Sequence, residues 1–373
     1  MTTTITQATA QYQAALLAAE EADVLPSERA EMLMQIAMGL QHLPRSELEI
    51  KQALNLYERA LVLCGEASPL LSARISARMG GAWQSIPGAG QESLYCAQAC
   101  LEAALAGLKA YGEVEEIADA EVLLGLTLQT LAQFGQARIQ DAIQAYHRAL
   151  RVFTRDSHPQ EYAVLHNNLA VAYLSIPAHD QQGKMREALA VQSFEEVLKV
   201  ITLVDHPNEY AMAQNNLGNA LQHASSGHRV DNLLRALEAY DEALKVRNPR
   251  TTPIEYANTL ANKALALRSL PPGIWTEREQ SFVASAPAFA ISMMQPEHED
   301  AGSLARLEAL SATAGWPSAQ ATSDLSHLQA AHKLYHEAEQ IFANHHETGK
   351  ASLMREAIEA VTDELACFAL VTN

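Results

Sequence analysis

Hydrophobic positions along the chain recur with a constant helical spacing. An alanine is followed four residues later by a large residue, and then by alanine and leucine three and four residues further on, as in Ala142, Tyr146, Ala149 and Leu150. Spacings of three and four residues place side chains on one face of a helix. The pattern predicts six such helices, here called B helices, with their large residues at Tyr12, Tyr57, Leu101, Tyr146, Phe194 and Tyr240.

A second pattern follows each large residue after 23 to 25 positions. It has a small residue, an apolar residue before it, and a large apolar residue three positions after it; only Lys263 departs from the apolar rule. These positions predict a second kind of helix, the A helix. Pro44, Pro87, Pro177 and Pro271 mark its ends, since proline cannot continue a helix. The small residues are Ala37, Gly80, Gly125, Ala170, Gly218 and Ala264.

Together the two patterns resemble the tetratricopeptide repeat. The resemblance covers about residues 5 to 271 in six copies, with steps of 44 to 48 residues, whereas the usual period of the family is about 34. Asn167-Asn168-Leu169 and Asn215-Asn216-Leu217 are similar to the Asn-Asn-Leu motif of the kinesin-light-chain-like branch, and the long period is similar to that of bacterial arrays. The resemblance implies an all-α, right-handed α-solenoid of antiparallel helix pairs.

The pattern weakens after residue 271. The next large residue is expected near position 286, but Pro287 stands there, and proline inside a helix costs about 3 kcal/mol. Ala331, Tyr335 and Ala338 restore the pattern two periods after Tyr240. We therefore expect a repeat array over 1–271, a degenerate repeat or loop over 272–323 with an A-helix remnant at 303–314, and a C-terminal helical cap over 324–373, with helices at 325–343 and 350–370.

In the tetratricopeptide family a partner segment lies along the concave face of successive A helices. The resemblance implies that positions six and three before the small residue, and one and four after it, point there. Asparagine offers two donors and an acceptor, so a row of these side chains can bind the backbone of an extended peptide. Alternatively, they bond adjacent helices and shape the array. The expected groove comprises Val164, Asn167, Val171, Met212, Asn215, Asn219, Gln222, Asn258 and Arg268.

Charge and composition narrow the class of partner. The 373 residues include 26 basic and 44 acidic side chains, a formal net charge of −18, and 48% are hydrophobic. This charge opposes binding to nucleic acid or to an anionic membrane. No apolar run is long enough to span a membrane, and the N-terminus has no signal-peptide pattern. We expect a cytoplasmic protein without a cofactor, whose partner is a neutral or basic protein or peptide.

Three further features offer other chemistry. His332, His336 and Glu339 share a helix face and suit a divalent metal ion, although a solvated face or a helix contact explains them more simply. Cys96 and Cys100 lie one helical turn apart beside the large residue of a B helix, where packing explains them. The apolar segment 282–294 is either an adaptable contact surface or an irregular packing layer.

Sequence motifs of enzymes are absent. The chain contains no Gly-x-Gly-x-x-Gly, no phosphate loop, no His-Glu-x-x-His and no Gly-x-Ser-x-Gly. The sequence therefore favours a non-catalytic scaffold or adaptor that binds a peptide or partner protein in the concave groove. One alternative is an assembly factor or chaperone for a multi-subunit enzyme, including a metal-containing one. Another is an enzymatic or metal-binding function in the C-terminal region.

Overall fold

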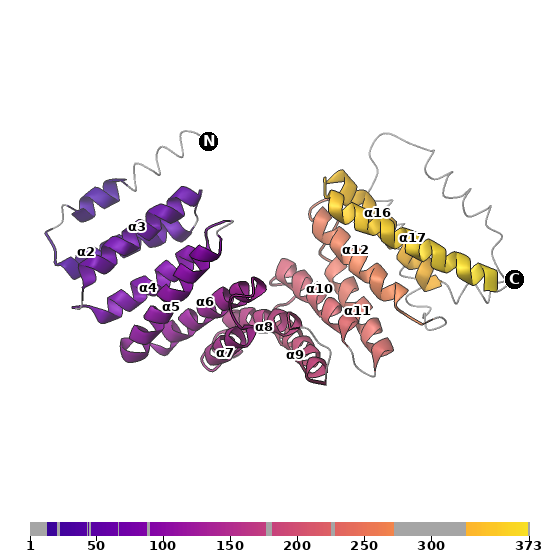
Figure 1. Cartoon of the computed structure of the whole chain (residues 1–373), viewed down its shortest axis with the longest axis horizontal. Coiled ribbons are helices and arrows are strands. Elements are labelled where there is room, and N and C mark those ends of the chain that lie inside the picture. The colour runs from indigo at the N-terminus through magenta and orange to yellow at the C-terminus, as the bar shows by residue number, and fades with distance from the viewer. Residues whose placement is uncertain are drawn as a thin grey trace. The chain divides into compact units, whose positions relative to one another are not determined.

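The computed structural model describes residues 13–20, 23–42, 44, 46–65, 67–87, 90–176, 181–224, 228–271 and 326–371. All regular secondary structure in these ranges is helical, and successive helices are paired (Figure 1). The chain divides into two compact units, Met1–His179 and Asp180–Asn373. None of the described helices is long and apolar enough to cross a membrane.

In the first unit, a helix at residues 13–20 is followed by alternating A and B helices. Three of the A helices pack against the B helix that follows them, α2 on α3, α4 on α5 and α6 on α7. The A helices also contact one another in the order α2, α4, α6, α8, so they form one layer. The A helices are α2 (Pro26–His42), α4 (Pro69–Gln84), α6 (Val114–Gln133) and α8 (Pro159–Leu174), and the B helices are α3 (Glu47–Cys64), α5 (Gln91–Tyr111) and α7 (Ile139–Ala149).

The second unit has the same alternation. The A helix α10 packs against α9 and α11, and α12 packs against α10, α11 and α16, with α17 against α16. The C-terminal helices expected at 325–343 and 350–370 are confirmed within two residues by α16 and α17. The helices of this unit are α9 (Gln181–Leu198), α10 (Pro207–His223), α11 (Arg229–Leu244), α12 (Pro253–Arg268), α16 (Ser326–Asn344) and α17 (Thr348–Val371).

The large residue of a B helix packs on the small residue of the A helix before it. A Cβ atom added to Gly125 would lie 2.4 Å from Cε1 of Tyr146, and one added to Gly218 would lie 2.5 Å from Cε1 of Tyr240. Both tyrosines are fully buried. Only glycine permits this approach, so the predicted pairing of small and large residues is confirmed. Tyr57, Leu101 and Phe194 are buried as well, and Tyr12 lies outside the described residues.

Prolines stand at the starts of several A helices and beyond the ends of others. Pro159, Pro207 and Pro253 begin α8, α10 and α12, and the residue before each has nearly the same backbone conformation, with φ between −141° and −136°. Proline suits this place because its φ is already helical and the first turn needs no amide donor. At the other end, α4 and α12 each stop three residues before Pro87 and Pro271.

The B helix that pairs with α12 is α16. The Tyr256 hydroxyl on α12 donates a hydrogen bond to Glu337 on α16, with an oxygen–oxygen distance of 3.0 Å. Tyr210 on α10 donates in the same way to Glu242 on α11, also at 3.0 Å. Both tyrosines stand eight residues before the small residue, and both glutamates two residues after the large one. Tyr335 is therefore the large residue of the α12 pair itself, and not that of a further complete repeat.

The Glu337 carboxyl makes this pair sensitive to pH. Burial raises the pKa of Glu337 above its usual value, and the Tyr256 hydrogen bond and the charge of Lys333 oppose this only in part. A carboxyl with a raised pKa stabilises the fold while it is protonated and loses this contribution as the pH rises. We expect the stability of Glu337→Gln to increase relative to wild type as the pH rises above 4.5, the usual value. Denaturant unfolding at a series of pH values measures this.

The matched control for Glu337→Gln is Glu356→Gln, which removes an exposed carboxylate from α17. Its stability difference from wild type should change little with pH. If Glu337→Gln also showed a constant difference, burial of Glu337 would not raise its pKa.

The expected domain boundaries at 271 and 323 stay predictions. The described contacts divide the chain between residues 179 and 180, inside the expected repeat array. The A-helix remnant expected at 303–314 and the apolar segment 282–294 lie outside the described residues.

Candidate functional site

In the first unit, the predicted groove residues lie on α8. Val164 and Val171 expose 51% and 37% of their surface, and Leu174, on the same face, exposes 38%. Asn167 lies between them and is partly buried. Its Oδ1 atom and the Nδ2 atom of Asn168 are buried without a hydrogen-bond partner in the described part of the chain. This face of α8 thus combines exposed apolar side chains with amides.

On α10, the predicted groove residues divide into accessible and buried ones. Met212 is 45% exposed and Asn219 is partly buried, whereas Asn215 and Gln222 are each only 8% exposed. Asn262 on α12 donates from Nδ2 to the Oδ1 atom of Asn215 at 3.3 Å. Asn215 therefore links two adjacent A helices. This is the alternative to peptide binding that the sequence allowed for these asparagines.

On α12, Asn258 is partly buried and Leu265 is 38% exposed. Arg268 binds Glu364 on α17, and its Nε atom lies 3.0 Å and 3.2 Å from the two carboxylate oxygens. Because Arg268 is engaged within the protein, we leave it out of the surface considered below.

In three helix pairs, a buried tyrosine hydroxyl donates to an A-helix glutamine that stands four residues after the small residue. Burial raises the pKa of these tyrosines, so each hydroxyl stays protonated and needs an acceptor. In the α4–α5 pair, where the large residue Leu101 has no hydroxyl, the residue at the same place is Gln84, and its Nε2 atom donates to the Leu123 carbonyl of α6 at 2.7 Å. The pairs are Tyr57 with Gln41 at 2.7 Å, Tyr146 with Gln129 at 2.7 Å and Tyr240 with Gln222 at 2.9 Å.

This role of Gln222 is not predicted by the spacing of the A helix alone. The available signal is the joint occurrence of tyrosine on one helix and glutamine on the other, which requires that the pairing of the helices is already known. Gln222 thus serves the interior of the α10–α11 pair.

The Tyr240 hydroxyl has a second amide neighbour, Asn219, in addition to Gln222. The Tyr240 oxygen lies 2.8 Å from Oδ1 of Asn219 and 2.9 Å from Oε1 of Gln222. Asn219 is also the only polar residue at its place, one position after the small residue, among the six A helices. The other five residues at this place are Met38, Gly81, Leu126, Val171 and Leu265.

The ionised side chains next to these positions are engaged. Lys263 is buried and pairs with Asp241 of α11, and Arg247 donates to the Thr259 hydroxyl at 2.7 Å. The accessible predicted groove positions on α10 and α12 therefore carry amide and apolar groups.

The metal candidates on α16 make contacts within the protein. The rings of His332 and His336 meet edge to face with centroids 4.6 Å apart, and Arg355 donates to Glu339 at 2.9 Å. Burial, and then the neighbouring His336, lowers the pKa of His332. Across the described ranges, no group of three or more His, Cys, Asp or Glu side chains is placed to hold a metal ion.

The two cysteines on α5 are partly buried and free. Burial raises the pKa of Cys100 to about 11, with smaller contributions from Cys96 and Glu58. The Cys100 thiol is therefore protonated at neutral pH and has little nucleophilic or metal-binding character.

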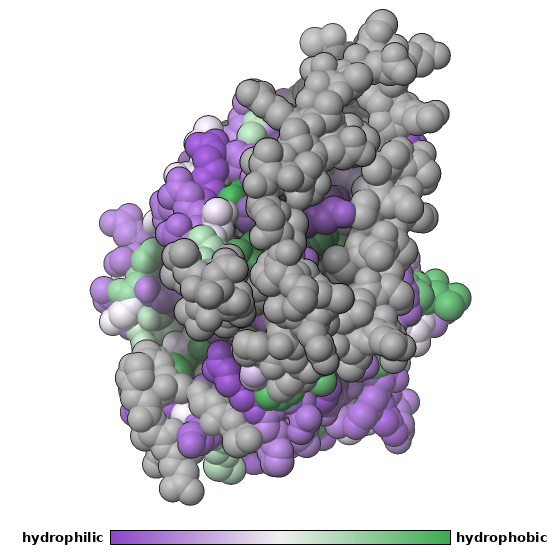
Figure 2. All heavy atoms as spheres, turned by 90° about the vertical axis from the view of Figure 1, so that its right-hand side faces the viewer, coloured by the Kyte–Doolittle hydropathy of each residue, from purple (hydrophilic) through white to green (hydrophobic). Residues whose placement is uncertain are grey.

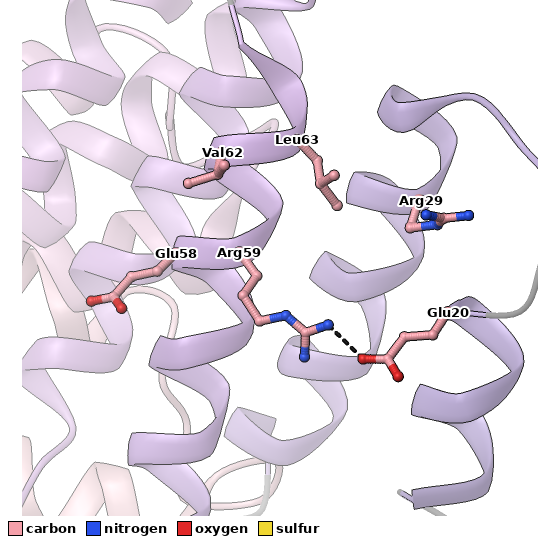
Figure 3. Close-up of a pocket in the computed structure, with 6 residues that line it drawn as sticks. All are labelled: Glu20, Arg29, Glu58, Arg59, Val62 and Leu63. Carbon is pink, nitrogen blue, oxygen red and sulfur yellow. Dashed lines mark hydrogen bonds and ion pairs between the residues drawn. The ribbon is translucent and has the colours of Figure 1, made fainter.

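A pocket at the start of the first unit lies between the helix at 13–20, α2 and α3 (Figure 3). The ion pair between Arg59 and Glu20, 2.5 Å long, crosses it. Glu58 and Arg29 point away from this pair. Two of the four charged side chains that line the pocket are thus paired with each other. It is lined by Glu20, Arg29, Glu58, Arg59, Val62 and Leu63.

Figure 2 shows the side of the chain that bears α16 and α17. The described side chains visible on it are mostly hydrophilic, and the hydrophobic ones form small separate patches. The atoms in view that belong to described residues therefore form no continuous apolar surface on this face.

No family model and no curated protein matches the sequence. Among solved structures, the chain is similar to the MamA protein, with a TM-score of 0.38 and 18% identity over 58% of this chain and 97% of that one. It is also similar to YrrB, described as a TPR protein with an unusual peptide-binding site, with a TM-score of 0.39 and 20% identity over 64% and 91% of the two chains. A third is a signal-transduction ATPase with a tetratricopeptide repeat sensor from Pyrococcus horikoshii, with a TM-score of 0.44 and 13% identity over 94% and 48%.

The packing within each unit agrees with the resemblance seen in the sequence. In each unit a small A-helix residue receives the large residue of the next B helix, as Gly125 receives Tyr146 and Gly218 receives Tyr240. A helices also contact one another within each unit. The described chain therefore has a tetratricopeptide-like fold of paired helices.

Proposed function

We propose that this protein is a non-catalytic, cytoplasmic scaffold or adaptor that binds an extended segment of a partner protein on the A helices of its second unit. The observation that carries the proposal is the juxtaposition of exposed Met212 and Leu265 with the amides of Asn219 and Asn258 on the adjacent helices α10 and α12. Apolar side chains of a bound segment gain contacts with the first two, and its backbone gains hydrogen bonds from the amides.

The proposed partner segment is uncharged where it lies on α10 and α12. An ionised side chain there would lose hydration without gaining a counter-charge, because Lys263 and Arg268 already pair with carboxylates. Peptide groups and apolar side chains have no such penalty. The net charge of −18 favours a partner that is neutral or basic elsewhere, and it accelerates association more than it strengthens binding.

Selection from a library of short random peptides, displayed on phage and presented to the full chain, tests this proposal. We expect the selected peptides to share a core that is apolar and uncharged. Met212→Asp and Leu265→Asp should each weaken binding of the synthetic peptides by roughly tenfold or more, since a loss of about 1.4 kcal/mol corresponds to tenfold. Isothermal titration calorimetry measures the affinities.

Leu353→Asp on α17 is the matched control, because Leu353 is 59% exposed and lies outside the proposed surface. It should leave the affinity unchanged, and circular dichroism should show that all three variants are folded. The proposal is wrong if the selection returns no peptide, or if the selected peptides bind the Met212 and Leu265 variants as tightly as they bind the wild type.

An assembly factor and an enzyme in the C-terminal region are the other functions that the sequence allows. Neither is favoured by a particular contact among the described residues. The experiment above separates the enzyme from the scaffold, because an enzyme in the C-terminal region does not require Met212 and Leu265 to contact a peptide. An assembly factor would hold an unassembled subunit in the same groove, and it differs from the scaffold in binding its immature client transiently.

A further inference from the structure

We infer that the Tyr240 hydroxyl is a positioning group, which holds Asn219 for hydrogen bonding to the backbone of the bound segment. The inference rests on the proposed function and concerns the same surface of α10. It assigns backbone recognition to one amide, Asn219, and assigns its orientation to a residue buried beneath it.

The first argument is that Asn219 exceeds what the fold requires. Tyr57 and Tyr146 are buried like Tyr240, and each has a single glutamine as its hydrogen-bond partner. Gln222 fills this role for Tyr240. An additional polar side chain at a place where the other A helices have apolar residues or glycine therefore needs a reason outside the packing of the pair.

The second argument comes from the number of hydrogens. A hydroxyl has one hydrogen and two lone pairs, so Tyr240 donates to only one of the two amide oxygens at a time. When it donates to Asn219, the NH₂ group of Asn219 points away from the hydroxyl. When it donates to Gln222, Asn219 donates its NH₂ group to the hydroxyl oxygen and turns Oδ1 outward. In both states Tyr240 holds one end of the Asn219 amide and leaves the other end available.

The third argument is accessibility. Gln222 is only 8% exposed, whereas Asn219 is less buried. Met212 stands seven residues before Asn219 on the same face of α10. Leu265 holds the same place on α12 as Asn219 does on α10, one position after the small residue. An extended chain that contacts Met212 and Leu265 therefore passes Asn219.

The chemistry of the occupant follows from these groups. A peptide unit has one acceptor and one donor, and the Asn219 amide offers a donor or an acceptor according to the state of Tyr240. Such recognition depends on the backbone and is independent of charged side chains. The segment recognised is thus an extended, uncharged stretch of polypeptide with apolar side chains on either side of the bonded peptide unit.

A double-mutant cycle on the full chain tests the inference, with a peptide selected on the wild type as the probe. Asn219→Ala and Tyr240→Phe should each lower the affinity roughly three- to tenfold, the range expected for one hydrogen bond. The double variant should bind no more weakly than Asn219→Ala alone, because the hydroxyl acts through Asn219. A purely structural effect of Tyr240→Phe would instead add to that of Asn219→Ala.

Tyr57→Phe is the matched control, since it removes the same kind of hydrogen bond, to Gln41, in the first unit. It should reduce stability much as Tyr240→Phe does and leave the peptide affinity unchanged. Thermal unfolding of both variants shows whether they lose the same stability.

The outcomes separate the inference from the proposed function. The inference is overturned if Tyr240→Phe leaves the affinity unchanged, or if its effect adds fully to that of Asn219→Ala. In either case the proposed function stands provided that Leu265→Asp still weakens the same peptide. If Leu265→Asp has no effect on any selected peptide, the proposed function fails and the inference fails with it.

Discussion

Replacing Tyr146 with alanine is expected to lower the free energy of unfolding by about 3 to 5 kcal/mol, the range for removing a buried aromatic side chain. The ring is fully buried against Gly125, and its hydroxyl donates to Oε1 of Gln129 at 2.7 Å. Truncation leaves a cavity in the core cluster of the first unit and removes the partner of Gln129. Chemical denaturation followed by circular dichroism measures the loss.

Tyr111→Ala on α5 is the matched control, because Tyr111 is 62% exposed. It should change the free energy of unfolding by about 0.5 kcal/mol or less, as is usual for surface positions. An unfolding curve of Tyr146→Ala that coincides with that of the wild type would mean that the A and B helices are paired in a different register.

The second large effect is expected from Asp241→Ala, at about 3 kcal/mol or more of destabilisation. Lys263 is almost fully buried, and Asp241 is its carboxylate partner. Removing Asp241 takes away a carboxylate that offsets the cost of burying the Lys263 charge in a medium of low polarity. Denaturant unfolding of the variant measures this loss.

A second substitution should rescue this variant. The position of Lys263, directly before the small residue, is apolar in the other five A helices, so Lys263→Leu fits the local packing pattern. The double variant Asp241→Ala, Lys263→Leu is expected to recover most of the stability, because the buried charge that lost its carboxylate partner is removed as well. A double variant no more stable than Asp241→Ala would show that the buried charge is not the cause.

The pairing of the helices can be predicted from the sequence because it depends on the volumes of the side chains that meet, a small one on the A helix and a large one on the B helix. Glycine or alanine stands wherever a large residue of the B helix packs on the A helix, as Gly218 does beneath Tyr240, and both residues recur at steps that the period reveals. The same logic predicts α16 from Ala331, Tyr335 and Ala338. The helix that pairs with α16 is harder to predict. The spacing from Tyr240 gives the number of residues between two helices but does not show whether they are in contact. The packing of α12 against α16, together with the bond from Tyr256 to Glu337, shows this pairing.

The candidate site is predicted only in part, for a related reason. A position on a helix specifies the direction of a side chain, and this is enough to predict that Met212 and Leu265 are exposed. It does not specify what a neighbouring helix offers to that side chain. Asn215 and Arg268, which we expected in the groove, are engaged by Asn262 and by Glu364, and Glu364 is 96 residues away from Arg268 in the chain.

Photocrosslinking with a selected peptide is the measurement that tests the proposed binding surface most directly. The peptide carries a photoreactive side chain at its apolar core, and mass spectrometry locates the crosslinked residues in the full chain. Our account predicts crosslinks within 212–222 on α10 and 258–265 on α12, and their loss in Leu265→Asp. Crosslinks that lie instead on α16 and α17, or in the first unit, would contradict it.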